Sequence, residues 1–305
     1  MSRNLKRKIP YPLIIDGGLS NVLEAQGFDL THKLWSAKLL DSHPAAITKA
    51  HLTYLEAGAQ CIITSSYQAS IPGFLEVGYD KTMAKKLLLK TVELAEKALE
   101  AYLTTTEIDF IPLIAASIGP YGAYLANGSE YRGDYGVSNE VLKEFHEERL
   151  YLLDETNADF FACETIPSFQ EAKILATILK KTDKPAWVSF SCKDGSHIND
   201  GTKMEDVVSL FQDHPNVFAI GVNCTEPKYI ASLIKIIKSK APLKRIVVYP
   251  NAGLEYDAIT KTWSGSSSTD SFAARSKEWV DLGANIIGGC CQIGPKHIKE
   301  MNKYF

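Results

Sequence analysis

The chain has 305 residues, of which 45% are hydrophobic and 23% charged, so it can bury a large core as an ordinary globular protein. Its net charge of −3 gives no basic footprint for nucleic acid or for an anionic membrane, and neither is expected as a partner. No apolar signal region follows the basic start MSRNLKRKIPYP, and no apolar run approaches the roughly 20 residues that span a bilayer.

Short apolar or β-branched runs alternate with longer amphipathic stretches along the whole chain. The short runs predict eight strands, at 13–16, 61–64, 110–117, 160–164, 187–191, 218–222, 245–249 and 285–288. The amphipathic stretches predict eight helices, at 45–57, 80–103, 138–157, 168–181, 203–212, 227–239, 269–282 and 295–303. Residues typical of helix N-termini precede or open several of these helices: Pro44, Ser138, Ser168, Thr225 with Pro227, Ser268 and Pro295.

Eight strand–helix units indicate a parallel sheet that is covered by helices. At this length they favour a single closed (β/α)₈ barrel of the TIM type, spanning 1–305 as one domain. An open doubly wound sheet would carry a glycine-rich turn after its first strand, but that strand ends in Asp16-Gly17-Gly18 and no GxGxxG follows. The active site is therefore expected at the C-terminal face, where the strands end.

Three of the six cysteines fall at predicted strand ends, Cys224 after the sixth strand and Cys290 and Cys291 after the eighth. Three thiolates suit catalytic Zn²⁺, which binds sulfur at about 2.3 Å and keeps a fourth position open. Adjacent residues on a straight strand point to opposite faces, so Gly288-Gly289 is expected to provide a sharp turn that brings both thiols to one metal.

Other interpretations of the cysteines stay open at this point. Cysteine is often only a small core residue, and no compact C-x-x-C motif is present. A vicinal disulfide at Cys290-Cys291 is disfavoured because six cysteines without an export signal indicate reduced thiols in a cytoplasm. Cys61 and Cys163 are expected to be structural, and Cys192 is ambiguous because it lies close to the rim.

Two carboxylates also fall at strand ends. Asp16 follows the first strand, although it could simply cap the turn before Gly17. Glu164 ends the apolar run FFAC and is expected to project into the barrel mouth. A buried carboxylate without a partner is costly, so a cationic group from ligand or protein is expected beside Glu164.

With these positions assigned, the sequence resembles the homocysteine S-methyltransferase family over almost its whole length. The resemblance is carried by DGG (16–18), ETIP (164–167), GVNC (221–224) and GGCC (288–291), which follow in order at strand ends. It implies that Cys224, Cys290 and Cys291 bind Zn²⁺ and that Asp16 and Glu164 hold the amino group of homocysteine. The expected substrate-binding set at this rim also includes Gly17, Gln68, Ser117 and Asn223.

The segments SSYQAS (65–70) and 117–133 resemble the branch that uses S-methylmethionine or S-adenosylmethionine rather than betaine. Three positions depart from the family pattern. Asn127 stands where an aspartate is usual, Ala252 where a serine is usual, and Leu254 where an acid is usual. All three are expected to affect the donor or the rate rather than the zinc ligands.

The expected activity is zinc-dependent methyl transfer from a sulfonium donor to the thiol of homocysteine, in which the metal ionises the thiol so that no histidine base is needed. Selenocysteine is an alternative acceptor. A zinc-dependent barrel hydrolase is less favoured, because three thiolates would make a metal-bound water less reactive. A metal-free cysteine-based sensor would leave Asp16 and Glu164 unexplained.

Overall fold

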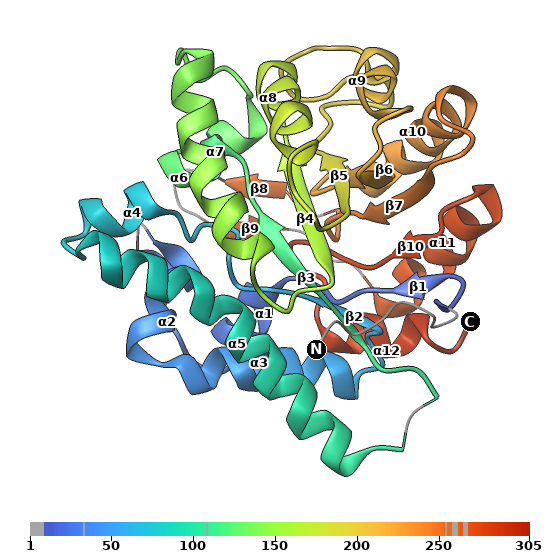
Figure 1. Ribbon diagram of the computed structural model, residues 1–305. Helices are drawn as coiled ribbons and strands as arrows, with labels where there is room; N and C mark the ends of the chain where they lie inside the picture. The colour runs from blue at the N-terminus through green and yellow to red at the C-terminus, as the bar shows by residue number, and fades with distance from the viewer. Residues whose placement is uncertain (1–8, 33, 108, 254, 258–261, 265–267) are drawn as a thin grey trace.

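The computed structural model describes residues 9–32, 34–107, 109–253, 255–257, 262–264 and 268–305, and within them eight parallel strands form one sheet surrounded by helices (Figure 1). The strand order is β1-β10-β7-β6-β5-β4-β3-β2. A parallel bridge between Ile15 and Cys61 joins the two outermost strands, so the sheet closes on itself. The predicted (β/α)₈ barrel is confirmed.

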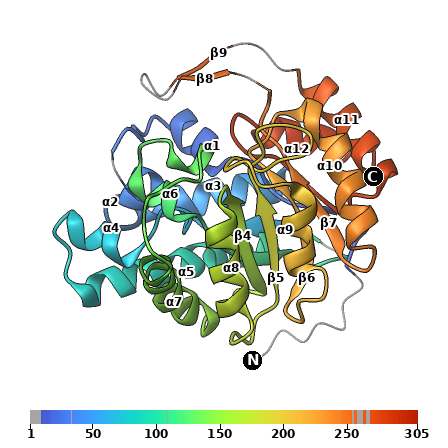
Figure 2. The same ribbon diagram turned by 90° about the horizontal axis from the view of Figure 1, so that it is seen from above.

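All eight barrel strands lie where the apolar runs predict them. They are β1 (Leu13–Ile14), β2 (Cys61–Ile63), β3 (Leu113–Ile118), β4 (Phe160–Ile166), β5 (Ala186–Phe190), β6 (Val217–Asn223), β7 (Arg245–Tyr249) and β10 (Ile286–Ile287). The eight predicted helices form the outer ring seen in Figure 2. They are α3 (Pro44–Glu56), α5 (Lys81–Thr105), α7 (Asn139–Asp154), α8 (Phe169–Leu179), α9 (Met204–Phe211), α10 (Pro227–Lys240), α11 (Thr269–Leu282) and α12 (Pro295–Met301).

Most of the predicted helix starts are also confirmed. The hydroxyls of Ser138, Ser168 and Ser268 each accept a hydrogen bond from the backbone N–H three residues later, which satisfies one free donor of the helix terminus. Thr225 is an exception, because Glu226 is the N-cap residue of α10. The Thr225 hydroxyl instead accepts a hydrogen bond from the backbone of Cys192 and so ties together the ends of β5 and β6.

Several short elements at the ends of the barrel have no counterpart among the predicted elements. The helical ones are α1 (Leu19–Ala25), η1 (Trp35–Lys38), α2 (Leu39–Ser42), α4 (Ile71–Glu76), α6 (Tyr121–Leu125) and η2 (Ser129–Tyr131). An antiparallel hairpin, β8 (Glu255–Asp257) with β9 (Thr262–Ser264), stands apart from the barrel strands in Figure 2. These elements have seven residues or fewer, which is too short for a hydrophobic period to be recognised.

The apolar core has two layers, as a helix-covered barrel requires. The larger layer fills the space between the sheet and the helices. It includes Cys163, which was expected to be a structural residue. The smaller layer fills the barrel interior around Trp187, Phe160 and Leu113. No described helix combines the length and the apolar composition that crossing a bilayer would require.

His51, on α3, is fully buried and its two ring nitrogens have no hydrogen-bond partner among the described atoms. Burial lowers the pKa of His51 to about 4, so the unfolded chain binds this proton at a higher pH than the native protein does. The stability that the neutral ring permits is therefore complete above the ordinary histidine pKa of about 6.5 and declines as the pH falls toward 4.

Between about pH 7.5 and pH 5 the wild type should lose about 2 kcal/mol of its free energy of unfolding because of His51. His51→Leu should not show this loss. Urea unfolding of both proteins at the two pH values measures the difference. His43→Gln, at an exposed position at the start of α3, is the matched control and should leave the pH dependence unchanged. An equal loss of stability in His51→Leu and in the wild type would contradict the assignment.

Candidate metal and substrate site

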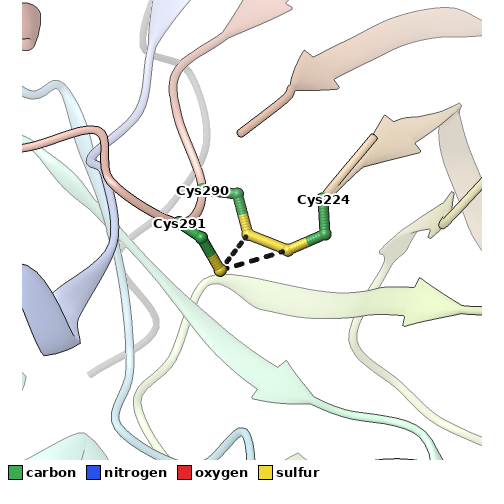
Figure 3. Close-up of side chains that lie close together, drawn as sticks. All are labelled: Cys224, Cys290 and Cys291. Carbon is green, nitrogen blue, oxygen red and sulfur yellow. Dashed lines mark hydrogen bonds between the residues drawn. A yellow bond between two sulfur atoms is a disulfide. The ribbon is translucent and has the colours of Figure 1, made fainter. Parts of the chain in front are cut away.

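Three cysteine sulfurs meet at the C-terminal mouth of the barrel (Figure 3). Cys224 and Cys290 are joined as a disulfide, although they are 66 residues apart, and their Cα atoms lie 5.5 Å apart. The Cys291 sulfur lies 3.9 Å from that of Cys224 and 4.0 Å from that of Cys290. The expected convergence of the three residues is observed, whereas the expectation that all of them carry reduced thiols does not describe this structure.

The backbone around the cysteines is held by the neighbouring strands. The Cys290 N–H donates to the carbonyl of Pro250 at 2.8 Å, and the Gly289 N–H donates to that of Asp16 at 3.1 Å. Cys224 has a φ of 45°, a conformation that non-glycine residues rarely adopt and that is enriched at active sites. This conformation at the end of β6 places the Cys224 sulfur against the end of β10.

The glycines before Cys290 act differently from the predicted turn. Neither Gly288 nor Gly289 has a positive φ, and the positive φ in this loop belongs to Gln292, at 64°. A Cβ atom at Gly289 would lie 2.0 Å from the side chain of Ile293. Gly289 is therefore required for close packing between the strand end and the following loop, rather than for a left-handed turn.

The cysteines line a cavity of about 680 Å³ at the barrel mouth, a size typical of small-molecule sites. Its described lining residues include no lysine or arginine but five acids: Asp16, Glu24, Asp29, Glu130 and Glu164. The cavity is therefore acidic, and it favours cationic ligands.

Asp16 and Glu164 both line this cavity and are both buried. One carboxylate oxygen of Asp16 accepts from the backbone of Ile63 at 2.8 Å, whereas Oδ1 is buried with no hydrogen-bond partner among the described atoms. Burial raises the pKa of Asp16 well above its ordinary value, and the nearby Glu164 raises it further. An unsatisfied buried oxygen beside a second carboxylate is the arrangement that a cationic ligand would stabilise.

Glu164 is held from two sides. The Ser117 hydroxyl lies 2.5 Å from its Oε1, and the Tyr249 hydroxyl also bonds to the carboxylate. Burial raises the pKa of Glu164 to about 7, against the lowering effect of these two hydrogen bonds. The protein therefore orients the carboxylate, and no lysine or arginine of the described lining residues is available to pair with it, which leaves that role to a ligand.

The remaining predicted substrate-binding residues divide into two groups. Gln68 and Gly17 line the cavity, and the Oε1 atom of Gln68 is buried without a described partner. Ser117 and Asn223 are not among the lining residues. Asn223 Oδ1 accepts from the backbone of Thr165 at 2.7 Å, and its Nδ2 donates to the Thr165 hydroxyl at 2.6 Å. Asn223 thus holds the segment after Glu164, where Thr165 has a φ of 59°.

The cavity is also lined by residues that the motifs did not single out, among them Tyr67, Glu130 and Glu24. Tyr131 also lines the cavity, and its hydroxyl is hydrogen-bonded to the Cys291 sulfur. Tyr121 and Tyr124 do not line it, because they pack against Phe145 on α7. A tyrosine-rich loop gives no signal as to which rings face inward, since the loop has no regular period.

The three residues that depart from the family pattern have different surroundings. Asn127 lines the cavity, and its side chain accepts from the backbone of Ser129 at 3.1 Å. Ala252 is buried, and its N–H donates to the Cys291 carbonyl at 3.1 Å. Leu254 lies outside the described residues.

The comparisons with known proteins agree on one family. A sequence profile of homocysteine S-methyltransferases matches residues 13–305. Homocysteine S-methyltransferase YbgG of Bacillus subtilis is 45% identical over 296 residues, which cover 95% of this chain and 94% of that protein. The chain belongs to the homocysteine S-methyltransferase family.

Solved structures of one family member match the whole fold. The homocysteine methyltransferase MmuM from Escherichia coli, described as the metallated form, matches with a TM-score of 0.87 and 41% identity, over 98% of this chain and 97% of that one. The form of MmuM described as oxidised matches with a TM-score of 0.88, over 96% of each chain. A selenocysteine methyltransferase from Astragalus bisulcatus is 39% identical over 95% of this chain and 91% of that protein.

The three sulfurs lie close enough together to bind one metal ion. In a tetrahedral site with zinc–sulfur bonds of about 2.3 Å, two sulfurs lie about 3.8 Å apart. The Cys291 sulfur already lies near this distance from both of the others. A disulfide and metal ligation are alternative states of these sulfurs, because a metal binds the thiolate form. Reduction of the Cys224–Cys290 pair is thus needed before all three can ligate.

Proposed function

We propose that the protein transfers a methyl group from S-methylmethionine, or from S-adenosylmethionine, to the thiol of L-homocysteine, with Zn²⁺ held by Cys224, Cys290 and Cys291. The observation that carries the proposal is the meeting of three cysteine sulfurs with the unsatisfied oxygen of Asp16 in one acidic cavity. The family membership supports the same reaction and argues against the hydrolase alternative.

The acceptor is recognised through its amino group. The unpartnered oxygen of Asp16 and the carboxylate of Glu164 together would accept hydrogen bonds from an ammonium group. Ser117 and Tyr249 orient Glu164 for this contact from behind. A homocysteine bound in this way extends its thiol toward the cysteines, which line the same cavity.

The acceptor sulfur must be a thiolate to attack a methyl group. When bound, Zn²⁺ supplies the ionisation of that thiol, so the thiol proton is lost to solvent without a protein base. Cys224, Cys290 and Cys291 would hold the metal, and the Tyr131 hydroxyl donates a hydrogen bond to the Cys291 sulfur. Among the described lining residues the one histidine is His32, which belongs to the loop after α1.

The transfer itself is an in-line displacement. A new bond forms between the acceptor sulfur and the methyl carbon while the bond from that carbon to the donor sulfonium breaks, and the electron pair of the broken bond neutralises the sulfonium. The protein contributes alignment and exclusion of water. The acids of the cavity stabilise the positively charged donor while it binds, and Tyr131 offers its ring to the same cation.

S-methylmethionine should give a kcat/KM about 10- to 100-fold above that of S-adenosylmethionine, the range that pocket contacts of a few kcal/mol produce. Betaine should support almost no turnover, because it has a single cationic group and lacks the amino group that would pair with a second acid. Methionine formation from homocysteine with each donor, on reduced protein with and without zinc, measures this. Faster turnover with betaine would refute the donor assignment, and no methionine with any donor would refute the function.

Selenocysteine is a second candidate acceptor, because the relative from Astragalus bisulcatus is described as a selenocysteine methyltransferase. The selenol of selenocysteine sits one carbon closer to its amino group than the thiol of homocysteine does. A comparison of the two acceptors at a fixed concentration of S-methylmethionine separates them. We expect homocysteine to be preferred.

A further inference from the structure

A buried carboxylate outside the cavity, Glu171, binds both ends of the segment 119–135. Glu171 lies in the first turn of α8 and is fully buried. Its Oε1 accepts from the backbone N–H of Tyr121 at 2.6 Å, and its Oε2 accepts from the hydroxyl of Tyr135 at 2.8 Å. One side chain thus joins two points that are 14 residues apart.

Two further buried side chains from α7 complete the network. The Nε2 atom of His146 lies 2.7 Å from Oε1 of Glu171, and its Nδ1 lies 2.8 Å from Nη2 of Arg149. Arg149 also donates to the carbonyl of Gly119, at the start of the segment. Burial lowers the pKa of His146 to about 4, so the ring is neutral; it donates from Nε2 to Glu171 and accepts at Nδ1 from Arg149.

The middle of the segment forms one wall of the cavity. Asn127, Gly128, Glu130 and Tyr131 all line it, and Tyr131 is hydrogen-bonded to Cys291. Glu130 is the acid that this segment contributes, and its Oε2 is buried without a hydrogen-bond partner among the described atoms. The network therefore holds the two ends of the segment, whereas the middle of the segment faces the cavity and contacts Cys291.

A buried ionic network is a weak source of stability, because the cost of desolvating its charges offsets most of their attraction. Such groups do, however, specify one geometry. Here the two hydrogen bonds from the segment 119–135 to Glu171 come from Tyr121 and Tyr135, near its two ends. Holding both ends of a loop keeps its middle in place.

We propose that Glu171 is a positioning residue that holds the segment 119–135 against the cavity and so sets the affinity for the methyl donor. The inference rests on the proposed function, because it takes this wall as the donor side. Glu171 is not among the described residues that line the cavity, so it acts through Tyr121 and Tyr135 and has no direct part in the chemistry.

The test uses Tyr135→Phe, which removes one hydrogen bond to Glu171 and leaves His146 and Arg149 paired. Donor KM should rise about five- to tenfold, while homocysteine KM and zinc content stay within about twofold of the wild type. Hydrogen–deuterium exchange in 119–135 should be faster. Tyr151→Phe is the matched control, because its hydroxyl donates to Glu147 on the outer side of α7 at 3.2 Å. That variant should behave as the wild type does.

Glu171→Gln and Glu171→Ala extend the series. Glutamine keeps an acceptor for the Tyr121 N–H, so it should retain part of the donor affinity that alanine loses. Unchanged exchange in 119–135 in Tyr135→Phe, or an equal rise of both KM values, would overturn the positioning role. Exchange is measured without substrates, so this failure is distinct from that of the proposed function, which is an absence of turnover in the wild type.

Discussion

Cys290→Ser should abolish methyl transfer and release the bound zinc. A serine oxygen is a poor replacement for a thiolate, and two cysteines leave the metal site incomplete. Loss of groups that only support metal ligands costs about 10- to 100-fold in affinity or activity, so loss of a ligand should cost more than about 100-fold. Methionine formation and zinc per chain, both measured on reduced protein, test this expectation.

Cys192→Ala is the matched control for that variant. Cys192 is also buried and close to the same rim, but it is not among the three sulfurs that meet at the barrel mouth. Its replacement should lower stability at most, by the cost of a small cavity. Full activity and one zinc per chain in Cys290→Ser would show that Cys290 is not a zinc ligand. The same result in Cys224→Ser or Cys291→Ser would show this for those residues.

Glu164→Gln should weaken homocysteine binding about 10- to 150-fold while zinc stays bound. The substitution preserves the shape of the side chain but replaces a carboxylate by a neutral amide, and a hydrogen bond to a charged group contributes roughly 1.5–3 kcal/mol. The Ser117 hydroxyl can still donate to the amide oxygen, so the position should remain ordered. The effect is measured by the KM for homocysteine and by the dissociation constant of homocysteine from the zinc-loaded protein.

An exposed acid provides the comparison for Glu164→Gln. Glu226, at the start of α10, pairs with Lys228 on the surface, and Glu226→Gln should leave both substrates unaffected. If homocysteine binds Glu164→Gln as tightly as it binds the wild type, Glu164 is structural. The ammonium would then rest on Asp16 alone, and Asp16→Asn would become the decisive variant.

The sequence alone was sufficient to predict the fold and the meeting of three cysteines at one end of the barrel. Strand and helix periods are local properties, so eight alternating runs were enough to predict the barrel, and the serine caps of α7, α8 and α11 were readable as single residues. Because all barrel strands end at one face, knowing that Cys224 and Cys290 end strands was enough to predict that they meet.

Contacts between distant segments were decided only by the tertiary structure. The joining of Cys224 to Cys290, the unsatisfied oxygen of Asp16 and the inward direction of Tyr131 all depend on how loops pack, and loops have no period from which to predict it. The role of Gly289 was misjudged for the same reason, since its constraint comes from Ile293 across the loop rather than from its own backbone. Glu171 gave no motif at all, because its role arises from two partners that only the folded chain brings to it.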